Sequence, residues 1–265
     1  MIHSTAVIHP KAHLDPTVEV GPFAIIDQHV TLGPNCRVGP HAYLTGHTTF
    51  GANNKIFASA VIGEAPQDLK YKDAPTRLRI GDNNTFREMV TVHRSNKDEE
   101  DTVIGNDNFL MVNAHVAHNC QIANNAIIAN GALLGGHVHI ADRAFISGNC
   151  LVHQFVRVGT LALMQGGSAI SKDLPPFTVA RGHNGICGLN TIGLRRAGFT
   201  AEQRLELKKL YHELFRSGEN LTKVAVDCKK LFTSQPAQLL IDFVLSSKRG
   251  VVPHFAALDF DEEET

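Results

Sequence analysis

The sequence predicts a mainly β fold, a parallel β-helix of six-residue repeats, followed by a C-terminal α-helical domain. Three observations lead to this fold class. An apolar residue recurs at every sixth position through most of residues 2–170, and a small or β-branched residue usually follows it four positions later. From Thr200 onward, the spacing of the apolar residues changes to that of an amphipathic helix.

The six-residue repeat keeps one phase along the chain. This period fits neither the 3.6 residues of a helical turn nor the two-residue alternation of a half-buried strand. It fits short parallel strands joined by tight turns, with three hexads forming one coil of 18 residues. We therefore expect coils from Ile2 to about Pro176, with the 26 repeated apolar residues facing the interior. These residues are Ile2, Ile8, Leu14, Val20, Ile26, Leu32, Val38, Leu44, Phe50, Ile56, Ile62, Ile80, Phe86, Val92, Ile104, Leu110, Val116, Ile122, Ile128, Leu134, Ile140, Ile146, Val152, Val158, Met164 and Ile170.

The cysteines follow the same repeat. Cys36, Cys120 and Cys150 occupy the small-residue position, where an apolar corner buries a thiol rather than activating it. The five cysteines show no CxxC spacing, so the sequence favours neither a disulfide framework nor a zinc ribbon. This cysteine usage indicates a protein of a reducing compartment.

Two stretches, residues 64–79 and 94–103, interrupt the repeat without shifting its phase. Ile62 and Ile80 are three hexads apart, and Val92 and Ile104 are two hexads apart. We therefore predict two loops that protrude from an intact β-helix, where binding residues often gather. The second stretch contains RSNKDEEDT, which is more typical of a solvated charged turn.

The C-terminal part begins after the prolines of DLPPF, which end the β-helix. We place the β-helical domain at residues 1–183 and the helical domain at residues 184–265. TAEQ, from Thr200, predicts a capping box that starts a helix, and the apolar residues of that helix are Leu205, Leu207, Leu210, Leu214 and Phe215. Further helices are expected over about 219–233 and 236–248, and the acidic tail DFDEEET is expected to be disordered.

Composition excludes several functional classes. The net charge of −1 gives no global attraction to nucleic acid or to a membrane surface. No apolar run reaches the ~18 residues that a transmembrane helix needs, so we expect no stable membrane insertion. The first residues, MIHSTAVIHP, lack the charged and apolar regions of a secretory signal. Together these features predict a cytoplasmic protein.

A cluster of histidines is the main candidate for chemistry. Residues 18 positions apart stack one strand spacing, ~4.8 Å, from each other. Gly136 and His137 follow His118 by one coil, and His153 and Gln154 follow it by two coils. We therefore predict a rough column of His118, His137 and His153 on one side of the β-helix.

His115 accompanies His118 in the motif NAHVAHNC, and His93 belongs to an earlier coil near the same side. Two interpretations of this cluster compete. Three facing imidazoles would ligate Zn²⁺, with His115, His118 and either His137 or His153 as ligands. Alternatively, one imidazole is a general base for a hydroxyl nucleophile, and the others position the substrate.

Seven motifs resemble one family and cover the chain from Ile2 to about Gly250. GEAPQDLKY, VTVHR, NAHVAHNC, LLGGHVHI, LVHQF, SKDLPPF and GLRRAGF occur in the order seen in the acyl-carrier-protein:UDP-N-acetylglucosamine O-acyltransferases, which are hexapeptide acyltransferases. The resemblance implies a left-handed β-helix, a homotrimer, and neither cofactor nor metal. It also implies transfer of a (3R)-3-hydroxyacyl chain from acyl carrier protein to the 3-hydroxyl of UDP-N-acetylglucosamine, the first step of lipid A biosynthesis.

The resemblance assigns roles to individual residues. His118 matches the general base, and the backbone N–H of Gly136 matches the oxyanion donor. Gly166 matches the position that measures the acyl chain, while Asn190 and Arg196 match the region that holds the uridine and the phosphates. The other substrate-binding positions are Gln67, Asp68 and Lys70, in a loop that reaches the nucleotide sugar from a neighbouring subunit, and His93, His115, Asn119, His137, His153 and Gln154.

The chain also departs from the family pattern. Asn119 follows the base where the family often has Asp, and an Asn orients an imidazole but stabilises its cation less well. Ile192 stands where many members have Glu, Ala197 where others continue with Arg, and Gln165 where another glycine is common.

Alternatives of other kinds stay open. One is a zinc-dependent enzyme like the carbonic-anhydrase-like relatives of the fold, and another is an acyltransferase that prefers a 3-amino sugar nucleotide. A catalytically silent scaffold is disfavoured by the complete histidine column, and the sibling N-acyltransferases are disfavoured because we expect no uridine-binding domain before the first hexad. Residues 191–258 hold eleven Lys and Arg against six Asp and Glu, which is typical of a solvated face or of a docking patch for acyl carrier protein.

Overall fold

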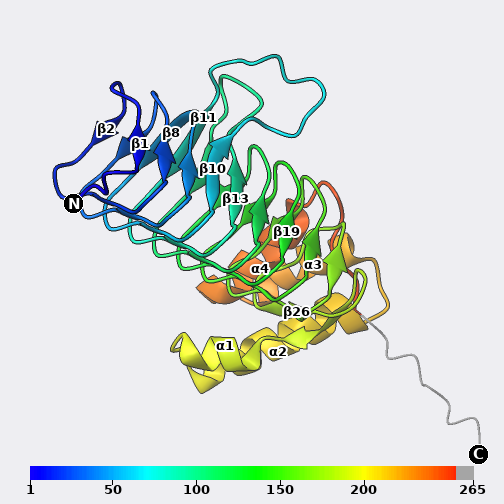
Figure 1. Cartoon of the computed structure of the whole chain (residues 1–265). Helices are drawn as coiled ribbons and strands as arrows, with labels where there is room; N and C mark the ends of the chain where they lie inside the picture. The colour runs from blue at the N-terminus through cyan, green and yellow to red at the C-terminus, as the bar shows by residue number, and fades with distance from the viewer. Residues whose placement is uncertain (255–265) are drawn as a thin grey trace, which may run out of the picture.

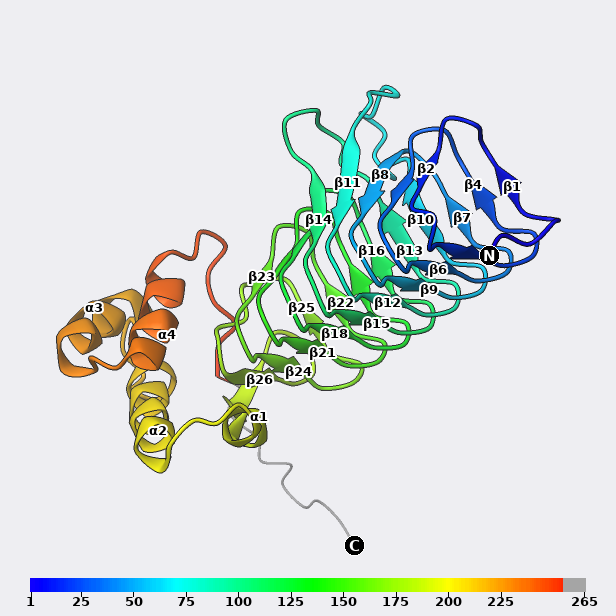
Figure 2. The ribbon, with the colours of Figure 1, turned by 90° about the vertical axis from the view of Figure 1, so that its left-hand side faces the viewer.

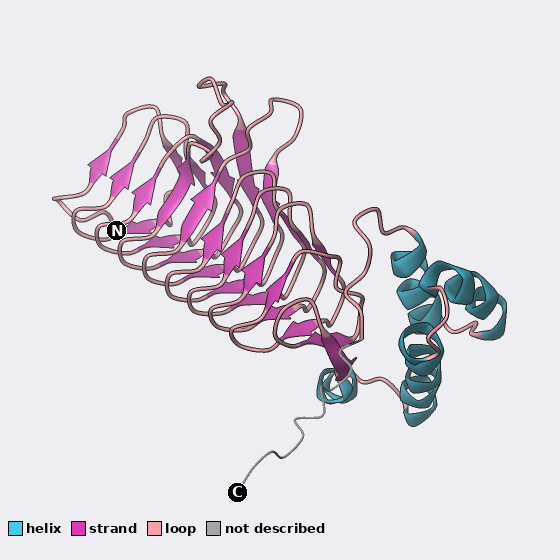
Figure 3. Cartoon of the chain, turned by 90° about the vertical axis from the view of Figure 1, so that its right-hand side faces the viewer, coloured by secondary structure: helices cyan, strands magenta, loops and turns pink. Residues whose placement is uncertain are grey.

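The six-residue repeats form strands of two to four residues that stack into three flat parallel sheets around one core. The computed structural model, which describes residues 1–254, shows these sheets as the three sides of a long prism (Figure 1). The first coils lie at one end of the prism, and the helices gather at the other (Figures 1 and 3). Each coil hydrogen-bonds to the next in parallel, as in Val7↔Ile25 and His115↔Leu133.

The three sheets are named here the first, second and third faces. The first face contains β1 (Val7–Ile8), β4 (Ile25–Ile26), β7 (Tyr43–Leu44), β10 (Val61–Glu64), β13 (Thr91–His93), β16 (His115–Val116), β19 (Leu133–Leu134), β22 (Leu151–Val152) and β25 (Ala169–Ile170). The second face contains β2 (His13–Leu14), β5 (Thr31–Leu32), β8 (His47–Phe50), β11 (Arg77–Ile80), β14 (Thr102–Ile104), β17 (Gln121–Ile122), β20 (His139–Ile140) and β23 (Arg157–Val158). The third face contains β3 (Glu19–Val20), β6 (Arg37–Val38), β9 (Lys55–Ile56), β12 (Thr85–Phe86), β15 (Phe109–Leu110), β18 (Ile127–Ile128), β21 (Phe145–Ile146), β24 (Leu163–Met164), β26 (Thr178–Ala180) and β27 (Ile186–Leu189).

The repeated apolar residues fill the prism. From Val20 to Ile170, every one of them is at most 4% exposed. The first coil differs from the prediction, because Ile2 is 53% exposed and Ile8 and Leu14 are only half-buried. Among residues 1–254, no coil packs on the outer side of these hexads, so they have an apolar neighbour on one side only.

The small-residue corners bury the cysteines, as predicted. Cys36, Cys120 and Cys150 are fully buried, and all five cysteines of the chain are free thiols. Burial raises the pKa of Cys120 to about 12, so this thiol stays protonated at neutral pH and is a poor nucleophile.

Both predicted loops protrude from the same edge of the prism, between the first and second faces (Figure 1, upper part). Residues 65–76 connect β10 to β11, and residues 94–101 connect β13 to β14. The strands after each loop keep their register, since Leu78 pairs with Thr48 on one side and with Thr102 on the other. The loops are therefore insertions into one edge, and the stacking continues beneath them.

The third face extends beyond the prolines that we expected to end the β-helix. β26 pairs in parallel with β24, through Leu163↔Val179, and β27 then pairs antiparallel with β26. Asn190 follows β27 and caps the first helix, so strand pairing continues to residue 189 rather than ending near Pro176. Backbone pairing can resume once the Pro-Pro segment has passed, because Thr178 and Val179 have N–H groups to donate.

Four helices complete the described chain, and three of them form a cluster beside the last coils (Figures 2 and 3). They are α1 (Thr191–Arg196), α2 (Ala201–Arg216), α3 (Leu221–Leu231) and α4 (Gln235–Leu245). The capping box predicted at Thr200 is present, with Thr200 and Gln203 bonding each other's backbone N–H groups. The short helix α1 was not predicted, and the acidic tail lies outside the described residues.

A buried carboxylate joins the helical cluster to the β-helix. Asp173 is 1% exposed and accepts hydrogen bonds from Arg157, at 2.8 Å, and from the hydroxyl of Ser247, at 2.9 Å. Arg157 also stacks on the ring of Phe243 in α4. Among residues 1–254, no helix combines the length and the apolar character needed to cross a bilayer.

The two neighbouring isoleucines of β4 provide a test of this core. Ile26 is 1% exposed, whereas Ile25 points outward and is 42% exposed. Ile26→Ala is expected to lower the free energy of unfolding by about 2–5 kcal/mol, because it leaves a cavity in a closely packed interior. Ile25→Ala, the matched control, should cost at most about 1 kcal/mol. Urea unfolding measures both, and equal losses would contradict the inward register.

Candidate active site

A cleft of about 670 Å³ runs along the edge where the first face meets the second. Successive coils contribute its wall, since β16, β19, β22 and β25 and the turns that follow the first three of them lie one above another. Most of the histidines singled out from the sequence gather here. The predicted site residues that line the cleft are Gln67, His93, His115, His118, Gly136, His153 and Gln154.

The imidazole of His118 is held by the amide of Asn119. Nδ1 of His118 lies 2.8 Å from Oδ1 of Asn119, which also accepts a hydrogen bond from the backbone N–H of Asn96 at 3.1 Å. The Asn119 amide nitrogen donates in the opposite direction, to Ser95 Oγ at 2.7 Å. Since a backbone N–H can only donate, the atom facing Asn96 must be the amide oxygen. Nδ1 of a neutral His118 therefore carries the proton, and Nε2 keeps a free lone pair.

The backbone position of Asn119 suits this role. Asn119 has a φ of 59°, and the residues stacked on it, His137 and Phe155, have φ values of 59° and 65°. This left-handed conformation is tolerated by Asn better than by most residues with a Cβ. Asn119 is only 3% exposed, so its amide acts inside the protein rather than in water.

Gly136 packs directly against the ring of His118. A Cβ at position 136 would lie 2.7 Å from Cε1 and 2.8 Å from Nε2 of His118, which is closer than carbon atoms approach. The position therefore requires glycine for space, and not for a positive φ. Within residues 1–254, the backbone N–H of Gly136 has no hydrogen-bond acceptor, so it is available to a group bound beside Nε2.

The half-buried His115 and the buried His93 form a second pair that lines the cleft. Nδ1 of His115 lies 2.7 Å from Oγ1 of Thr91, and the His93 ring meets it edge to face at 5.3 Å. Burial, followed by repulsion from His93, lowers the pKa of His115 to about 4. Burial also lowers the pKa of His93. His115 therefore stays neutral at pH 7, and the pair offers hydrogen bonds rather than charge.

His137 lies beside the cleft rather than in it. Its ring meets that of His118 edge to face at 5.3 Å and stacks on Phe155 at 4.5 Å. It lines a neighbouring hollow on the second-face side, together with Glu100 and Asn119. The predicted column is therefore three parallel rows, with Gly135 below His153, His118 below Gly136, and Asn119 below His137.

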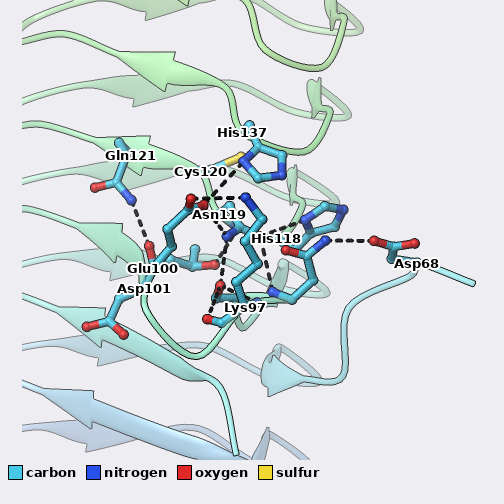
Figure 4. Close-up of polar contacts among 12 residues, drawn as sticks. Asp68, Lys97, Glu100, Asp101, His118, Asn119, Cys120, Gln121 and His137 are labelled. Atoms are coloured by element: carbon cyan, nitrogen blue, oxygen red, sulfur yellow. Dashed lines mark hydrogen bonds and ion pairs between the residues drawn. The ribbon is translucent and has the colours of Figure 1, made fainter. Parts of the chain in front are cut away.

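The loop of residues 65–76 contributes unequally. Gln67 lines the cleft of its own chain, and Asp68 accepts a hydrogen bond from the Asn96 side chain at 2.6 Å, close to His118 (Figure 4). The resemblance implied that both residues serve a neighbouring subunit, whereas here they lie beside the histidines of the same chain. Lys70 is exposed and does not line this cleft.

Three other predicted positions lie away from the cleft. Gly166 is exposed at the edge between the third and first faces, whereas His118 lies at the opposite edge of the first face. Asn190 caps α1 by accepting from the Gly193 N–H at 2.9 Å and donates to the Leu161 carbonyl at 2.9 Å. Arg196 is exposed at the end of α1. A single chain thus does not bring these three residues to His118.

The structure adds residues that sequence reasoning missed. His183 and Asn184 line the cleft from the turn after β26, and Arg249 lies 3.3 Å from Nδ1 of His153. Ser95 and Glu100 hold Asn119 from the loop that the sequence suggested was only a charged turn. The phase of the repeat could have indicated Ser95 and Glu100, because it places their loop one coil before His118 on the same edge.

The histidine cluster lacks the geometry of a metal centre. Across residues 1–254, no three His, Cys, Asp or Glu side chains converge as metal ligands would. Nδ1 atoms of His115 and His118 are bonded to Thr91 and Asn119, which leaves only Nε2 of each ring for another partner. The arrangement supports proton transfer at one imidazole better than it supports shared ligation.

Comparison with known proteins gives consistent matches. The family described as "Udp N-acetylglucosamine O-acyltransferase; Domain 2" matches residues 173–252, and bacterial transferase hexapeptide repeats match residues 101–136. The chain is 45% identical over 259 residues to an acyl-[acyl-carrier-protein]–UDP-N-acetylglucosamine O-acyltransferase of Herminiimonas arsenicoxydans, covering 95% of this chain and 99% of that protein.

Solved structures agree with these sequence matches. The Francisella novicida UDP-N-acetylglucosamine acyltransferase superimposes with a TM-score of 0.92 at 34% identity, over 100% of both chains. The Moraxella catarrhalis UDP-N-acetylglucosamine O-acyltransferase gives 0.91 at 38% identity, over 95% of this chain and 99% of that one. The predicted left-handed parallel β-helix with C-terminal helices is thereby confirmed.

The half-buried, neutral His115 should make stability depend on pH. The pKa of His115 is about 4 in the folded chain, and an unfolded histidine titrates near ~6.5, so the unfolded chain binds more protons between these values. Acidification through this window therefore destabilises the fold. When the pH falls from about 7.5 to about 5, the free energy of unfolding should decrease in both proteins. The decrease should be smaller in His115→Asn than in the unmodified chain, by on the order of 1 kcal/mol.

Urea unfolding at the two pH values measures this difference. The exposed His3→Asn variant controls for the loss of an imidazole and should follow the unmodified protein. An unchanged pH dependence in His115→Asn would show that His115 does not account for the effect.

Proposed function

This chain belongs to the family of acyl-[acyl-carrier-protein]–UDP-N-acetylglucosamine O-acyltransferases, and on that premise we propose that its cleft performs the acyl transfer with His118 as the general base. The chain is an acyltransferase of lipid A biosynthesis that moves an acyl chain from acyl carrier protein to UDP-N-acetylglucosamine. The hydrogen bond between His118 and Asn119 is the observation that supports the base most directly, because it leaves Nε2 as the proton acceptor.

The proposed transfer uses one proton acceptor and one hydrogen-bond donor. Nε2 of His118 takes the proton of the acceptor hydroxyl as its oxygen attacks the thioester carbonyl. The carbonyl becomes an oxyanion, and the free N–H of Gly136 donates a hydrogen bond to it. The oxyanion then collapses, the carbon–sulfur bond breaks, and the imidazolium returns the proton to the departing thiolate.

The acceptor and donor groups are proposed more finely from the motifs. The acceptor is the 3-hydroxyl of the glucosamine ring, and the acyl group is a (3R)-3-hydroxyacyl chain. An acceptor with a 3-amino group remains the second candidate, because a 3-amine could occupy the same place beside Nε2. Assays of the purified enzyme with 3-hydroxyacyl carrier proteins of several chain lengths and with both acceptors distinguish these substrates.

The other lining residues would hold the sugar nucleotide. His115 is half-buried and neutral, and His93 is buried, so they suit hydrogen bonds to sugar hydroxyls. His153, Gln154 and Gln67 stand at the open side of the same cleft. We also propose that Asn190 and Arg196 bind the nucleotide and that Gly166 contacts the acyl chain. Because these residues lie away from the cleft of their own chain, this part of the proposal requires a second subunit.

A homotrimer forms part of the proposal. The outward side of the first face carries exposed apolar side chains on its first coils and again beside the cleft, and a soluble monomer seldom leaves such groups uncovered. Val7, Ile25, Leu133 and Leu151 are 61%, 42%, 43% and 48% exposed. Packing of three prisms along their flat sides would cover these side chains and, because Leu133 and Leu151 line the cleft, bring the cleft of one subunit beside the next.

The helical cluster offers a surface for acyl carrier protein. An apolar hollow between β27 and α2 is rimmed by basic residues, among them Lys208, Lys209 and Arg216. Residues 191–258 hold eleven basic against six acidic side chains, and such an excess attracts an acidic partner. The five cysteines are free thiols, and thiols stay reduced in the cytoplasm, so a cytoplasmic location forms part of the proposal.

Removal of the imidazole tests the base. His118→Ala is expected to lower kcat by about 10²–10⁴-fold, the usual contribution of positioned proton transfer, with a much smaller change in substrate binding. A chelator should leave the unmodified enzyme active. Activity that survives in His118→Ala but disappears with chelator and returns with Zn²⁺ would instead support the zinc alternative.

Mixed trimers test the shared cleft. If Lys70 serves the cleft of a neighbouring subunit, then equal mixtures of Lys70→Ala and His118→Ala chains restore both residues in about a quarter of clefts. Activity should therefore exceed that of either variant alone. Mixtures of His118→Ala with His118→Gln provide the control without recovery. A failure to recover activity in stable mixed trimers would place Lys70 in its own subunit's site.

A further inference from the structure

A carboxylate stands directly behind the residue that holds the base. Asn119 Oδ1 contacts Nδ1 of His118 at 2.8 Å, and Asn119 Nδ2 donates to Oε2 of Glu100 at 3.0 Å (Figure 4). Glu100 belongs to the loop of residues 94–101 and does not line the cleft, so it does not reach a substrate bound beside Nε2. Its connection to the reaction passes through one amide group.

The partners of Asn119 explain why an amide fits there. Nδ2 faces two acceptors, Glu100 and Ser95 Oγ, and the Ser95 hydroxyl gives its own proton to the Lys97 carbonyl. A carboxylate at position 119 would turn lone pairs toward both acceptors and place two negative charges about 3 Å apart. The chain instead has a neutral amide at the buried position 119 and an acid, Glu100, that contacts this amide and not the imidazole.

Glu100 carries a negative charge at neutral pH. A hydrogen bond from Lys97, at 3.0 Å, is the main cause that holds its pKa below the usual range, and the bond from Asn119 acts in the same direction. His137 also faces it, with Nδ1 3.7 Å from Oε2. The Glu100 side chain is 48% exposed, so solvent weakens its field but does not cancel it.

We propose that Glu100 is a positioning residue for the acyl transfer, acting through Asn119 to orient His118 and to stabilise its imidazolium. This inference rests on the proposed role of His118 as the base. The carboxylate polarises the amide, which places more negative charge on Oδ1, where the Nδ1–H of His118 donates. The proton taken from the acceptor hydroxyl stays on His118, and no proton crosses the amide.

The charge of Glu100 can be removed with little change in shape. Glu100→Gln keeps an oxygen that accepts from Asn119 and should lower kcat about 10-fold, the scale of a charge-assisted hydrogen bond, while KM for UDP-N-acetylglucosamine changes less than about twofold. Lys97→Met is the matched control, because it removes the ion pair with Glu100 but touches neither Asn119 nor His118, and it should not lower kcat. Unchanged kcat in Glu100→Gln overturns the inference.

A double-mutant cycle separates this role from a structural one. Asn119→Ala removes the connection, so adding Glu100→Gln to it should cause no further loss of kcat. If the loop merely needs Glu100 for its shape, the two losses instead add, and the inference fails.

Exchange of the two groups gives a rescue that does not depend on how well Asn119→Ala folds. The double variant Asn119→Asp/Glu100→Gln moves the acid to the base and the amide to the loop, where it can donate to the new carboxylate. Its kcat should exceed that of Glu100→Gln alone by about 5-fold or more. A double variant no more active than Glu100→Gln contradicts the proposal.

The two proposals fail in different ways. Substantial activity in His118→Ala would refute the base itself, whatever Glu100 does. An inactive His118→Ala together with a fully active Glu100→Gln would leave the proposed function intact and refute only the role of Glu100.

Discussion

Backbone hydrogen bonds between consecutive coils are the interaction on which the whole site depends. The His137 N–H donates to the His118 carbonyl, and the Phe155 N–H donates to the Gly136 carbonyl, each at 2.9 Å. His118, Gly136 and their neighbours are therefore held at strand spacing by the ladder that also builds the fold. No side-chain contact needs to bring His118 and Gly136 together, because the repeat has already done so.

The regular stacking of the coils accommodates both loop insertions at one edge of the prism. Both insertions leave from the edge between the first and second faces, and both return to the same register. A loop at this edge adds side chains to the cleft without disturbing the apolar interior. Gln67 and Asp68 arrive from one loop, and Ser95 and Glu100 arrive from the other. Chemical groups thus collect along one edge, and small buried residues such as Cys120 lie beneath them at the same corner.

The placement of charge around His118 follows from the cost of burial. A carboxylate as enclosed as Asn119, which is 3% exposed, would lose most of its hydration. Glu100 keeps about half of its surface in water and has Lys97 as a partner, so its charge costs far less. The Asn119 amide lies between the two groups and bonds to both. This arrangement holds the imidazole of His118 in one orientation while the carboxylate stays partly hydrated.

Much of the architecture could be predicted because the repeat is local and periodic. The inward residues from Val20 to Ile170, the two outward loops and the capping box at Thr200 all follow from spacing along the chain. The motifs around His118 likewise identified the family, since they occur in order along a continuous chain. Exceptions occurred where the periodic environment ends, as at the exposed Ile2, which has no coil before it.

The tertiary structure alone decided which side chains share a surface. His137 stacks one coil above Asn119, yet it faces a different hollow from His118, because each row at the corner points its side chains in its own direction. Glu100 sits within a run of charges, and no pattern in that run distinguishes the one carboxylate that reaches Asn119. His183 lines the cleft and Arg249 contacts His153, although both belong to segments far along the chain. Periodicity determines where a backbone lies in the stack, but the direction of a side chain and its partners depend on contacts between distant segments, which spacing along the chain does not encode.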